Sequence, residues 1–352
     1  MGVDITKNVE FLDTQINDIA DSHNPDLTAQ LELEVYRILP EGSEQDFENF
    51  KSFIVKYNRT YEIGSSEYNK RFSIFKESVE RQKKLNSKRQ HPDDAKYGVN
   101  AFSDLTPDEF AEHYLGIYQR VPASTSSGYV PSSKEVDKIP SKFSLEGKGV
   151  LTSVRDQGAC GGCWAFSIVE CMETQNALKT KKLISLSTQQ LIDCARGGGD
   201  NGCKGGNICT TLAWMNDTKY KEVHEKDYPF KEKTGTCRNS STGILSIMDY
   251  WCTDMVNHED DMIASLYNHG PLAVAVDAST WQDYIEGVIQ HHCSAMYINH
   301  AVQIVGYDKS GEIPYYIVRN SWGKDWGLNG YLHVKIGSNM CGIATIVGSL
   351  DV

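Results

Sequence analysis

Cysteine is confined to one part of this chain. All ten cysteines lie between Cys160 and Cys341, whereas the 159 residues before them contain none. Small secreted domains concentrate disulfides, so this distribution predicts a disulfide-bearing C-terminal domain preceded by a segment of different character. The length of 352 residues agrees, because it suits two or three segments better than one small module.

Charge divides the N-terminal part further. Residues 1–50 hold two basic and twelve acidic side chains, whereas residues 51–90 hold eleven basic and four acidic ones. We interpret residues 1–46 as a solvated acidic extension. The whole chain has 35 basic and 47 acidic side chains, and a net charge of −12 argues against nucleic acid or an anionic membrane as a partner. The apolar runs are too short to predict a membrane-spanning helix, and acidic residues interrupt those near the start, so no secretory signal is predicted there.

Aromatic residues at three- and four-residue steps predict two helices after residue 46. The first stripe is Phe47, Phe50, Ile54, Tyr57 and Tyr61, and the second is Tyr68, Phe72, Phe75 and Val79. Two such helices can bury their stripes against each other. Thr106-Pro107-Asp108-Glu109 supplies a cap, a proline at the first helical position and an acid at the third, which starts a short helix. Residues 116–138 are rich in Ser, Pro, Gly and Thr and are predicted to form an exposed linker that is accessible to cleavage.

The stretch from Gln157 to Ser167, QGACGGCWAFS, carries the strongest chemical signal. Helix-compatible sequence follows Cys163, so its sulfur is expected at a helix N-terminus, where free N–H groups lower the pKa of a thiol and make it a nucleophile. Gly161 and Gly162 allow another backbone to come close.

A Cys-x-x-Cys pair has two other interpretations, a redox dithiol and a pair of zinc ligands. A zinc site needs a second matched pair, and Cys194 and Cys203 are badly spaced for one, so we expect no metal. The sequence downstream favours nucleophilic catalysis instead. His300 begins an alternating strand-like run 137 residues after Cys163, and Asn320 follows another strand-like run 20 residues later.

These residues resemble the papain-like cysteine protease family, and the resemblance covers roughly residues 47–350. It implies an α+β fold of two lobes over residues 139–352, with a helical lobe carrying Cys163 and a β-rich lobe carrying His300 and Asn320. Cys163 would be the nucleophile, His300 the general base and acid, Asn320 the residue that orients the imidazole, and Gln157 an oxyanion donor. Gly162 departs from the Ser or Ala of the family but removes no catalytic group. No cofactor is implied.

The resemblance also implies how a peptide substrate binds. Gly205 and Gly206 would pair with the substrate backbone, and Trp322 would shield the contact between His300 and Asn320. An uncharged pocket would receive the side chain two residues before the scissile bond and favour aliphatic or aromatic groups there. Its lining by position is Ile208, Ala275, Ile298, Ala301 and Ile346.

Upstream, residues 47–115 resemble the inhibitory propeptide of the same family. Two motifs carry this likeness, namely Glu67, Arg71, Phe75 and Asn86, and then Gly98, Asn100, Phe102 and Asp104. The linker 116–138 would cross the cleft, and the mature chain would begin near Ile139. The charge of residues 51–90 is opposite to that of the peptidase region, which suggests that acid weakens the attraction and releases the propeptide.

By the same resemblance, three disulfides would join Cys160 to Cys203, Cys194 to Cys237, and Cys293 to Cys341. Cys171, Cys209 and Cys252 stay unassigned, as buried thiols or with two of them paired. Disulfides imply an oxidising route. The family resemblance implies a lysosomal or extracellular location and cystatin-type inhibitors, and we also expect peptide or protein substrates and a monomeric state. The segments 281–284, 290–293 and 318–322 narrow the resemblance to one cathepsin subfamily.

Two other functions stay open at this point. One is a non-catalytic or weakly catalytic binding protein that keeps the fold, although the full set of catalytic side chains argues against it. The other is a Cys-x-x-Cys thiol oxidoreductase, in which Cys160 would act as a redox partner of Cys163.

Overall fold

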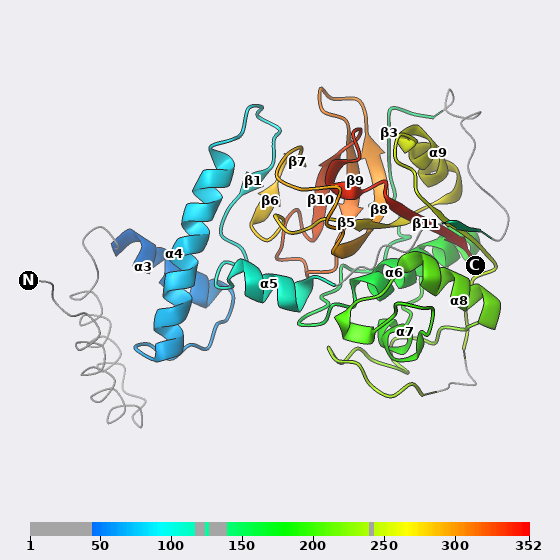
Figure 1. Ribbon diagram of the computed structural model, residues 1–352, viewed down its shortest axis with the longest axis horizontal. Coiled ribbons are helices and arrows are strands. Elements are labelled where there is room, and N and C mark those ends of the chain that lie inside the picture. Colours follow the sequence, from blue (N-terminus) through cyan, green and yellow to red (C-terminus); the bar gives the residue numbers. More distant parts are fainter. Residues whose placement is uncertain (1–43, 117–123, 127–138, 239–242) are drawn as a thin grey trace, which may run out of the picture.

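Three helices form the N-terminal unit, which we define as residues 44–116. The computed structural model describes residues 44–116, 124–126, 139–238 and 243–352 (Figure 1). Helices α3 (Glu44–Lys56) and α4 (Ser66–Asn86) lie at one side of the molecule, where α4 contacts the strand-rich region, and α5 (Pro107–Tyr114) follows between them and the helical lobe. Most of the predicted acidic extension, residues 1–43, lies outside the described residues.

The two aromatic stripes pack on each other, which confirms the two predicted helices. Six rings form one buried cluster between α3 and α4, namely Phe47, Phe50, Phe53, Tyr68, Phe72 and Phe75. The boundaries of the first helix differ from the prediction. It begins at Glu44, inside the expected extension, and ends at Lys56, before Tyr57 and Tyr61. The Tyr61 hydroxyl instead donates a hydrogen bond of 2.5 Å to the Asp104 carboxylate, which holds the chain after the helix.

Side-chain caps set where α4 and α5 begin. The Ser65 hydroxyl accepts a hydrogen bond from the backbone N–H of Tyr68 at 3.1 Å. The Thr106 hydroxyl accepts from the N–H of Glu109, and the Glu109 carboxylate accepts from the N–H of Thr106, so the capping box read from the sequence is confirmed. The cap fixes the direction of α5 and therefore the path of the residues that follow it.

The helical lobe is built around one buried helix. Helix α6 (Cys163–Thr180) is buried from Cys163 to Ala177 on every side, so it lacks the single apolar face of a surface helix. Helix α7 (Thr188–Cys194), the 3₁₀ turn η2 (Gly202–Lys204) and helix α8 (Ile208–Thr218) surround it. The start of α6 at Cys163 confirms that this cysteine lies at a helix N-terminus.

A sheet dominates the other lobe. Among the described residues it runs in the order β2-β4-β11-β5-β8-β9-β10-β7, and β3 also pairs with β8. Every pairing is antiparallel except that of β10 with β7. The strands are β2 (Ser124–Ser126), β3 (Lys142–Ser144), β4 (Asp249–Thr253), β5 (Leu272–Val276), β7 (Val288–Ile289), β8 (His300–Asp308), β9 (Tyr315–Arg319), β10 (Tyr331–Lys335) and β11 (Ile346–Asp351).

The sheet places the downstream motif residues. His300 is the first residue of β8, and Asn320 directly follows the last residue of β9, its neighbour in the sheet. Helix α9 (Glu259–His269) and the 3₁₀ turn η3 (Met340–Gly342) complete this lobe. Together the lobes confirm the predicted α+β architecture, and α6 packs against β5, β8 and β11 where they meet.

The N-terminal unit and the linker both pair with strands of the C-terminal region. Strand β1 (Lys96–Tyr97) pairs antiparallel with β6 (Tyr284–Glu286) in a separate two-stranded sheet. Strand β2, within the expected linker, adds to the edge of the large sheet by pairing with β4. The prediction that 116–138 is simply an exposed linker therefore needs correction at Ser124–Ser126 and at Gly116, which is buried.

Four disulfides join the described cysteines. The three pairs implied by the resemblance are Cys160–Cys203, Cys194–Cys237 and Cys293–Cys341. The fourth, Cys209–Cys252, ties α8 to β4 and so joins the two lobes. Cys171 remains a buried free thiol on α6, as does Cys163. Within the described ranges, no helix has the length and apolar character needed to cross a membrane.

Candidate active site

Cys163 is completely buried in this structure, at the first position of α6. Burial raises the pKa of its thiol to about 11, and the nearby backbone N–H groups of Ala301, Trp164 and Gly116 only partly counteract this. The expectation of a lowered thiol pKa is therefore wrong for the chain in this form. The physical reason is that residues of the N-terminal unit cover the sulfur, so a thiolate would have no access to water.

His300 is held by Asn320. Its Nε2 lies 2.7 Å from Asn320 Oδ1, and the same oxygen accepts the backbone N–H of Ser321 at 2.9 Å, which fixes the orientation of the amide. Nε2 must then carry the proton, so Nδ1 is left as an acceptor, and it is buried without a hydrogen-bond partner. Burial lowers the pKa of His300 to about 4, although the bond to Asn320 opposes the shift. Both the thiol and the imidazole are therefore neutral in this form.

Trp322 covers the imidazole. Its ring centroid lies 4.6 Å from that of His300, with the planes tilted by 30°. Aromatic side chains of the N-terminal unit pack on the same indole, with Phe110 at 5.1 Å and Phe102 at 5.8 Å in edge-on contacts. The N-terminal unit is thus anchored on the residue that shields the contact between His300 and Asn320.

Gln157 joins the two lobes beside the sulfur. Its Oε1 accepts the Ser321 hydroxyl at 2.6 Å, and its backbone N–H donates to the Ser321 carbonyl at 2.8 Å. Its Nε2 donates to the Cys160 carbonyl at 2.9 Å and to the Tyr114 carbonyl at 3.1 Å. A side-chain donor that could serve an oxyanion is therefore already bound to a carbonyl of the N-terminal unit.

The chain passes over Cys163 at Gly116. Its N–H donates to the Asn299 carbonyl at 2.8 Å. A methyl group at this position would lie 3.3 Å from the Gly161 carbonyl oxygen, 3.4 Å from Gly205 Cα and 3.6 Å from Cys163 Sγ. Even a methyl group would therefore fit tightly against the Gly161 carbonyl, and glycine lets the chain pass this close to the sulfur without crowding.

The expected pocket residues come together. Ile208, Ala275, Ala301 and Ile346 belong to one buried cluster, and Ile298 packs against it from a half-buried position. Gly205 lies beside Gly116, as described above, and Gly206 packs against the ring of Trp164. The structure therefore groups the expected pocket residues in one cluster with Cys163.

Sequence reasoning missed three contributors. Gly116 and the Tyr114 carbonyl contact the site through backbone atoms, which leave no side-chain signature. Ser321 fixes both Gln157 and Asn320, and its place in the Asn-Ser-Trp motif is the signal that could have identified it.

Polar contacts hold the N-terminal unit on the strand-rich lobe. Arg81 forms two hydrogen bonds with the Asp283 carboxylate, at 2.5 and 3.1 Å, and Gln82 donates to the same carboxylate at 2.9 Å. Lys96 pairs with Glu286 beside the two-stranded sheet.

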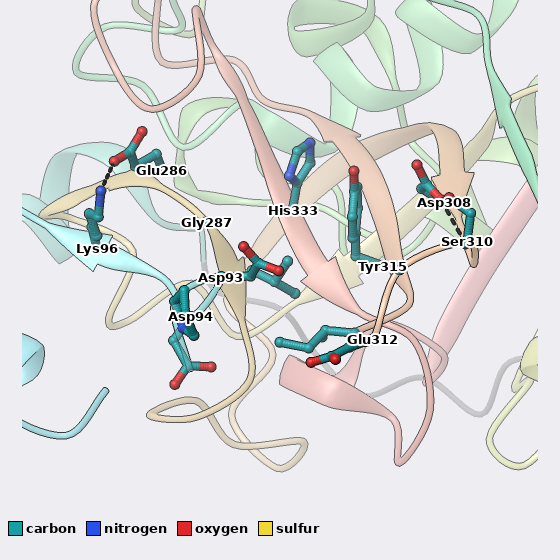
Figure 2. Close-up of a pocket in the computed structure, with 14 residues that line it drawn as sticks. Asp93, Asp94, Lys96, Glu286, Gly287, Asp308, Ser310, Glu312, Tyr315 and His333 are labelled. Carbon is teal, nitrogen blue, oxygen red and sulfur yellow. Dashed lines mark hydrogen bonds and ion pairs between the residues drawn. The ribbon is translucent and has the colours of Figure 1, made fainter. Parts of the chain in front are cut away.

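A cavity of about 440 Å³ opens next to this contact, between residues 92–96, 286–288 and 308–315 (Figure 2). Figure 2 shows Asp93, Asp308 and Glu312 around it, with Tyr315 and His333 on its wall. His333 stacks on Tyr315 with ring centroids 4.1 Å apart. None of the expected catalytic residues lines this cavity, so it belongs to the contact with the N-terminal unit rather than to the catalytic site.

Comparison with protein families decides the identity of this architecture. The model described as "Papain family cysteine protease" matches residues 139–349. The chain belongs to the papain family of cysteine proteases. A second model, "Cathepsin propeptide inhibitor domain (I29)", matches residues 50–110, so the chain is a precursor and its N-terminal unit, called the propeptide below, carries the inhibitor domain.

Individual relatives agree. The chain is 44% identical to cathepsin O of Mus musculus over 283 residues, which cover 80% of this chain and 89% of the relative. It is 45% identical to cathepsin O of Homo sapiens over 289 residues, with coverage of 80% and 87%. The subfamily indicated by the three short segments is cathepsin O, so this expectation is confirmed.

Solved precursors share the fold. A recombinant stem bromelain precursor superposes with a TM-score of 0.77 at 31% identity, covering 88% of this chain and 99% of that one. The digestive procathepsin L2 of Tenebrio molitor gives 0.78 at 28% identity, covering 87% and 100%. The expected two-lobed papain-like fold with a propeptide is confirmed. The oxidoreductase alternative requires Cys160 to act as the redox partner of Cys163, but Cys160 is bonded to Cys203.

Proposed function

We propose that this cysteine protease precursor hydrolyses peptide bonds through Cys163, His300, Asn320 and Gln157. The observation that carries the assignment is the free acceptor on His300. Because Asn320 binds Nε2, His300 Nδ1 is free to take the proton of a thiol, and no other polar group satisfies it. Cys163 at the start of α6 supplies the thiol.

The reaction then runs as acyl transfer to sulfur and from sulfur to water. His300 Nδ1 takes the thiol proton, and the Cys163 thiolate attacks the peptide carbonyl carbon. Gln157 Nε2 and the backbone N–H of Cys163 donate to the oxyanion. The imidazolium returns its proton to the leaving amine as the C–N bond breaks. His300 next takes a proton from water, whose oxygen attacks the thioester carbon. The C–S bond then breaks, the imidazolium returns its proton to the Cys163 sulfur, and the acid product leaves.

Removal of the propeptide is the step that switches this chemistry on. Burial is the largest cause of the raised pKa of Cys163 and of the lowered pKa of His300. Once Gly116 leaves the sulfur, water reaches both groups, the thiol pKa falls and the imidazole pKa rises. The two shifts favour a thiolate–imidazolium pair. The Gln157 amide also loses the Tyr114 carbonyl and becomes free for an oxyanion.

We propose an apolar requirement two residues before the scissile bond. The buried cluster of Ile208, Ala275, Ala301 and Ile346, with Ile298 at its edge, offers no charge to a substrate side chain. Gly205 and Gly206 would pair with the substrate backbone, and Trp322 would keep water from the bond between His300 and Asn320. A basic side chain would be buried there without a partner, which is costly.

The remaining assignments follow the family. We propose that activation cleaves within 116–138, so that the mature chain begins near Ile139. The described residues on either side of that segment support this cleavage position. Gly116 lies close to Cys163, and Lys142–Ser144 already pairs with β8 in the large sheet. We further propose a monomer that acts in lysosomes or outside the cell on protein substrates, needs no cofactor and is blocked by cystatin-type inhibitors.

The test is hydrolysis of a fluorogenic peptide with an apolar residue second from the cleavage site, by precursor that has been processed in acid. Native protein should cleave it, and Cys163→Ser should not. Cys171→Ser is the matched control, because this other free thiol is also buried on α6 but lies outside the catalytic set, and it should retain activity. No hydrolysis by native protein whose propeptide is shown to be gone would favour a binding protein instead.

A further inference from the structure

Arg319 is a fully buried charged side chain that the proposed chemistry does not use. It is the last residue of β9 and directly precedes Asn320, and its side chain has no exposed surface. Removing a guanidinium from water is costly unless it is paired and hydrogen-bonded. The contacts of Arg319 therefore indicate which segments of the chain it holds together.

Two of these contacts reach the segment that leads to Gln157. Nη2 of Arg319 donates to the Thr152 hydroxyl at 3.0 Å and to the Ser153 carbonyl at 2.8 Å. Ser153 precedes Gln157 by only four residues. The guanidinium thus connects β9, which ends directly before Asn320, to the segment that leads to Gln157, the proposed oxyanion donor.

Other contacts reach the strand of His300 and the helix of Cys163. Nη1 of Arg319 lies 3.4 Å from Gln303 Oε1, and Gln303 stands on β8 three residues after His300. Nη2 lies 3.4 Å from Glu170 Oε1, and Glu170 stands on α6 two helical turns after Cys163. The Gln303 amide also donates to the Thr174 hydroxyl on α6 at 3.1 Å, which closes a second link between β8 and the helix.

We propose that Arg319 is a positioning residue that aligns the four segments carrying the catalytic groups, with Glu170 as its anchor in the helical lobe. The proposal rests on the proposed function above. Cys163 and His300 come from different lobes, so their relative placement depends on what joins those lobes. A displacement of about 1 Å between reacting groups can cost about a hundredfold in rate, which is why one shared tether has a catalytic consequence.

Besides Arg319, the charged side chains that act on Glu170 are Arg155 and Glu173. Burial raises the pKa of Glu170, whereas Arg319 and Arg155 lower it and Glu173 raises it. Arg155 pairs with Glu173, one turn further along α6. Glu170→Gln keeps the size of the side chain and removes the carboxylate, so it weakens the anchor without opening a cavity.

The experiment uses full-length precursor of native protein, Glu170→Gln and Arg319→Lys, each processed to the mature form. We expect kcat to fall by about tenfold in Glu170→Gln with KM within about twofold of native, because alignment for the chemical step is lost while the binding surface is kept. Arg319→Lys keeps the charge but not the planar fork, so it should lie between the two. The rate of Cys163 alkylation by iodoacetamide at pH 5–7 should fall in parallel.

A matched control separates positioning from general stability. Asp193→Asn removes another buried carboxylate of the helical lobe, which holds Tyr228 and the backbone of Gly235. It should lower the unfolding temperature and leave kcat and alkylation unchanged.

If Glu170→Gln behaves like this control, Arg319 is only structural and the proposal is overturned. If Glu170→Gln does not fold, Arg319→Lys decides the question by the same two readouts. Failure of the proposed function would look different, as native protein without Cys163-dependent hydrolysis.

Discussion

The molecule has two interfaces of opposite character. The propeptide meets the peptidase domain through buried rings, such as Phe102 and Phe110 on Trp322, and at its edge through half-exposed pairs, such as Lys96 with Glu286, whose side chains are 48% and 49% exposed. The two lobes of the peptidase domain meet through buried groups, such as Arg319 with Glu170, at 0% and 2%. Water and protons reach the edge of the first interface, at Lys96 and Glu286, whereas Arg319 and Glu170 of the second are enclosed. One interface is therefore suited to release, and the other to keeping the catalytic groups aligned after release.

The cleft itself shows the same difference. Gln157 is bound to Ser321 of the strand-rich lobe by two hydrogen bonds, and these survive activation because both partners belong to the peptidase domain. Its bond to the Tyr114 carbonyl is lost when the propeptide leaves. The propeptide thus uses backbone atoms to occupy donors that the catalytic reaction needs later.

Breaking the backbone contact at the cleft should have the largest effect on inhibition. Gly116→Val would place a branched side chain against the backbone of Gly161 and Gly205, which lies 3.3–3.4 Å from the position of a first side-chain carbon. Overpacking of this kind costs about 1–3 kcal/mol, so the precursor should process itself at pH 7 about tenfold faster or more. The measurement is the rate of mature-chain formation on gels. Gly311→Ala is the control, since nothing lies within 4 Å of that position, and equal rates for the two variants would contradict the account.

Removing the buried end of the polar interface should have a smaller effect. Arg81→Met leaves the Asp283 carboxylate, whose side chain is 2% exposed, with Gln82 as its remaining side-chain donor. The loss should weaken propeptide binding by about 1 kcal/mol and speed processing about fivefold. Lys83→Met on the same helix removes a pair with Glu80 inside the propeptide and should change nothing. A similar acceleration in both variants would mean that α4 stability, not the interface, sets the rate.

Acid should also weaken the polar contacts between the propeptide and the peptidase domain. Each ion pair should contribute only a small part of this effect. The hydrogen bond and charge of Lys96 lower the pKa of Glu286 below 4.5. A carboxylate with a lowered pKa stabilises the complex above its unbound pKa, and this stabilisation is lost as the pH falls through the lowered value. Processing should therefore accelerate between pH 7 and pH 4, with the share from Glu286 appearing below about pH 4.5.

The pH profile of Glu286→Gln checks this assignment. The variant should process about twofold faster than native protein at pH 7, and the difference should shrink only below about pH 4.5, as native Glu286 takes up a proton and loses its charge. Glu80→Gln, which removes a pair within α4, should keep the native profile. Equal native rates at pH 7 and pH 5 would contradict the broader hypothesis that acid releases the propeptide.

Local sequence signals predicted several helix and strand boundaries of this protein correctly. The cap of α5 at Thr106, the helix start at Cys163 and the strand before Asn320 depend on neighbouring residues alone, and all three are where the sequence placed them. The family resemblance supplied the fold and grouped the pocket residues.

What could not be predicted depends on contacts between distant segments. The pairing of Cys209 with Cys252 requires that α8 lie against β4, which no local pattern states. The raised pKa of Cys163 depends on its burial, to which the propeptide contributes at Gly116, a residue that has no side chain and lies close to the sulfur. A helix N-terminus favours a thiolate, yet burial under the propeptide outweighs it.

The most direct test of the central claim is the alkylation rate of Cys163 before and after processing. Iodoacetamide is added to precursor and to mature protein between pH 5 and pH 8, and mass spectrometry quantifies the labelled Cys163 peptide, with buried Cys171 as the internal reference. A thiol pKa of about 11 leaves little thiolate in the precursor at pH 7. The mature protein should therefore react at least about a hundredfold faster at Cys163 and not at Cys171. Equal rates at Cys163 in both forms would contradict the claim that the propeptide backbone holds the nucleophile protonated and covered.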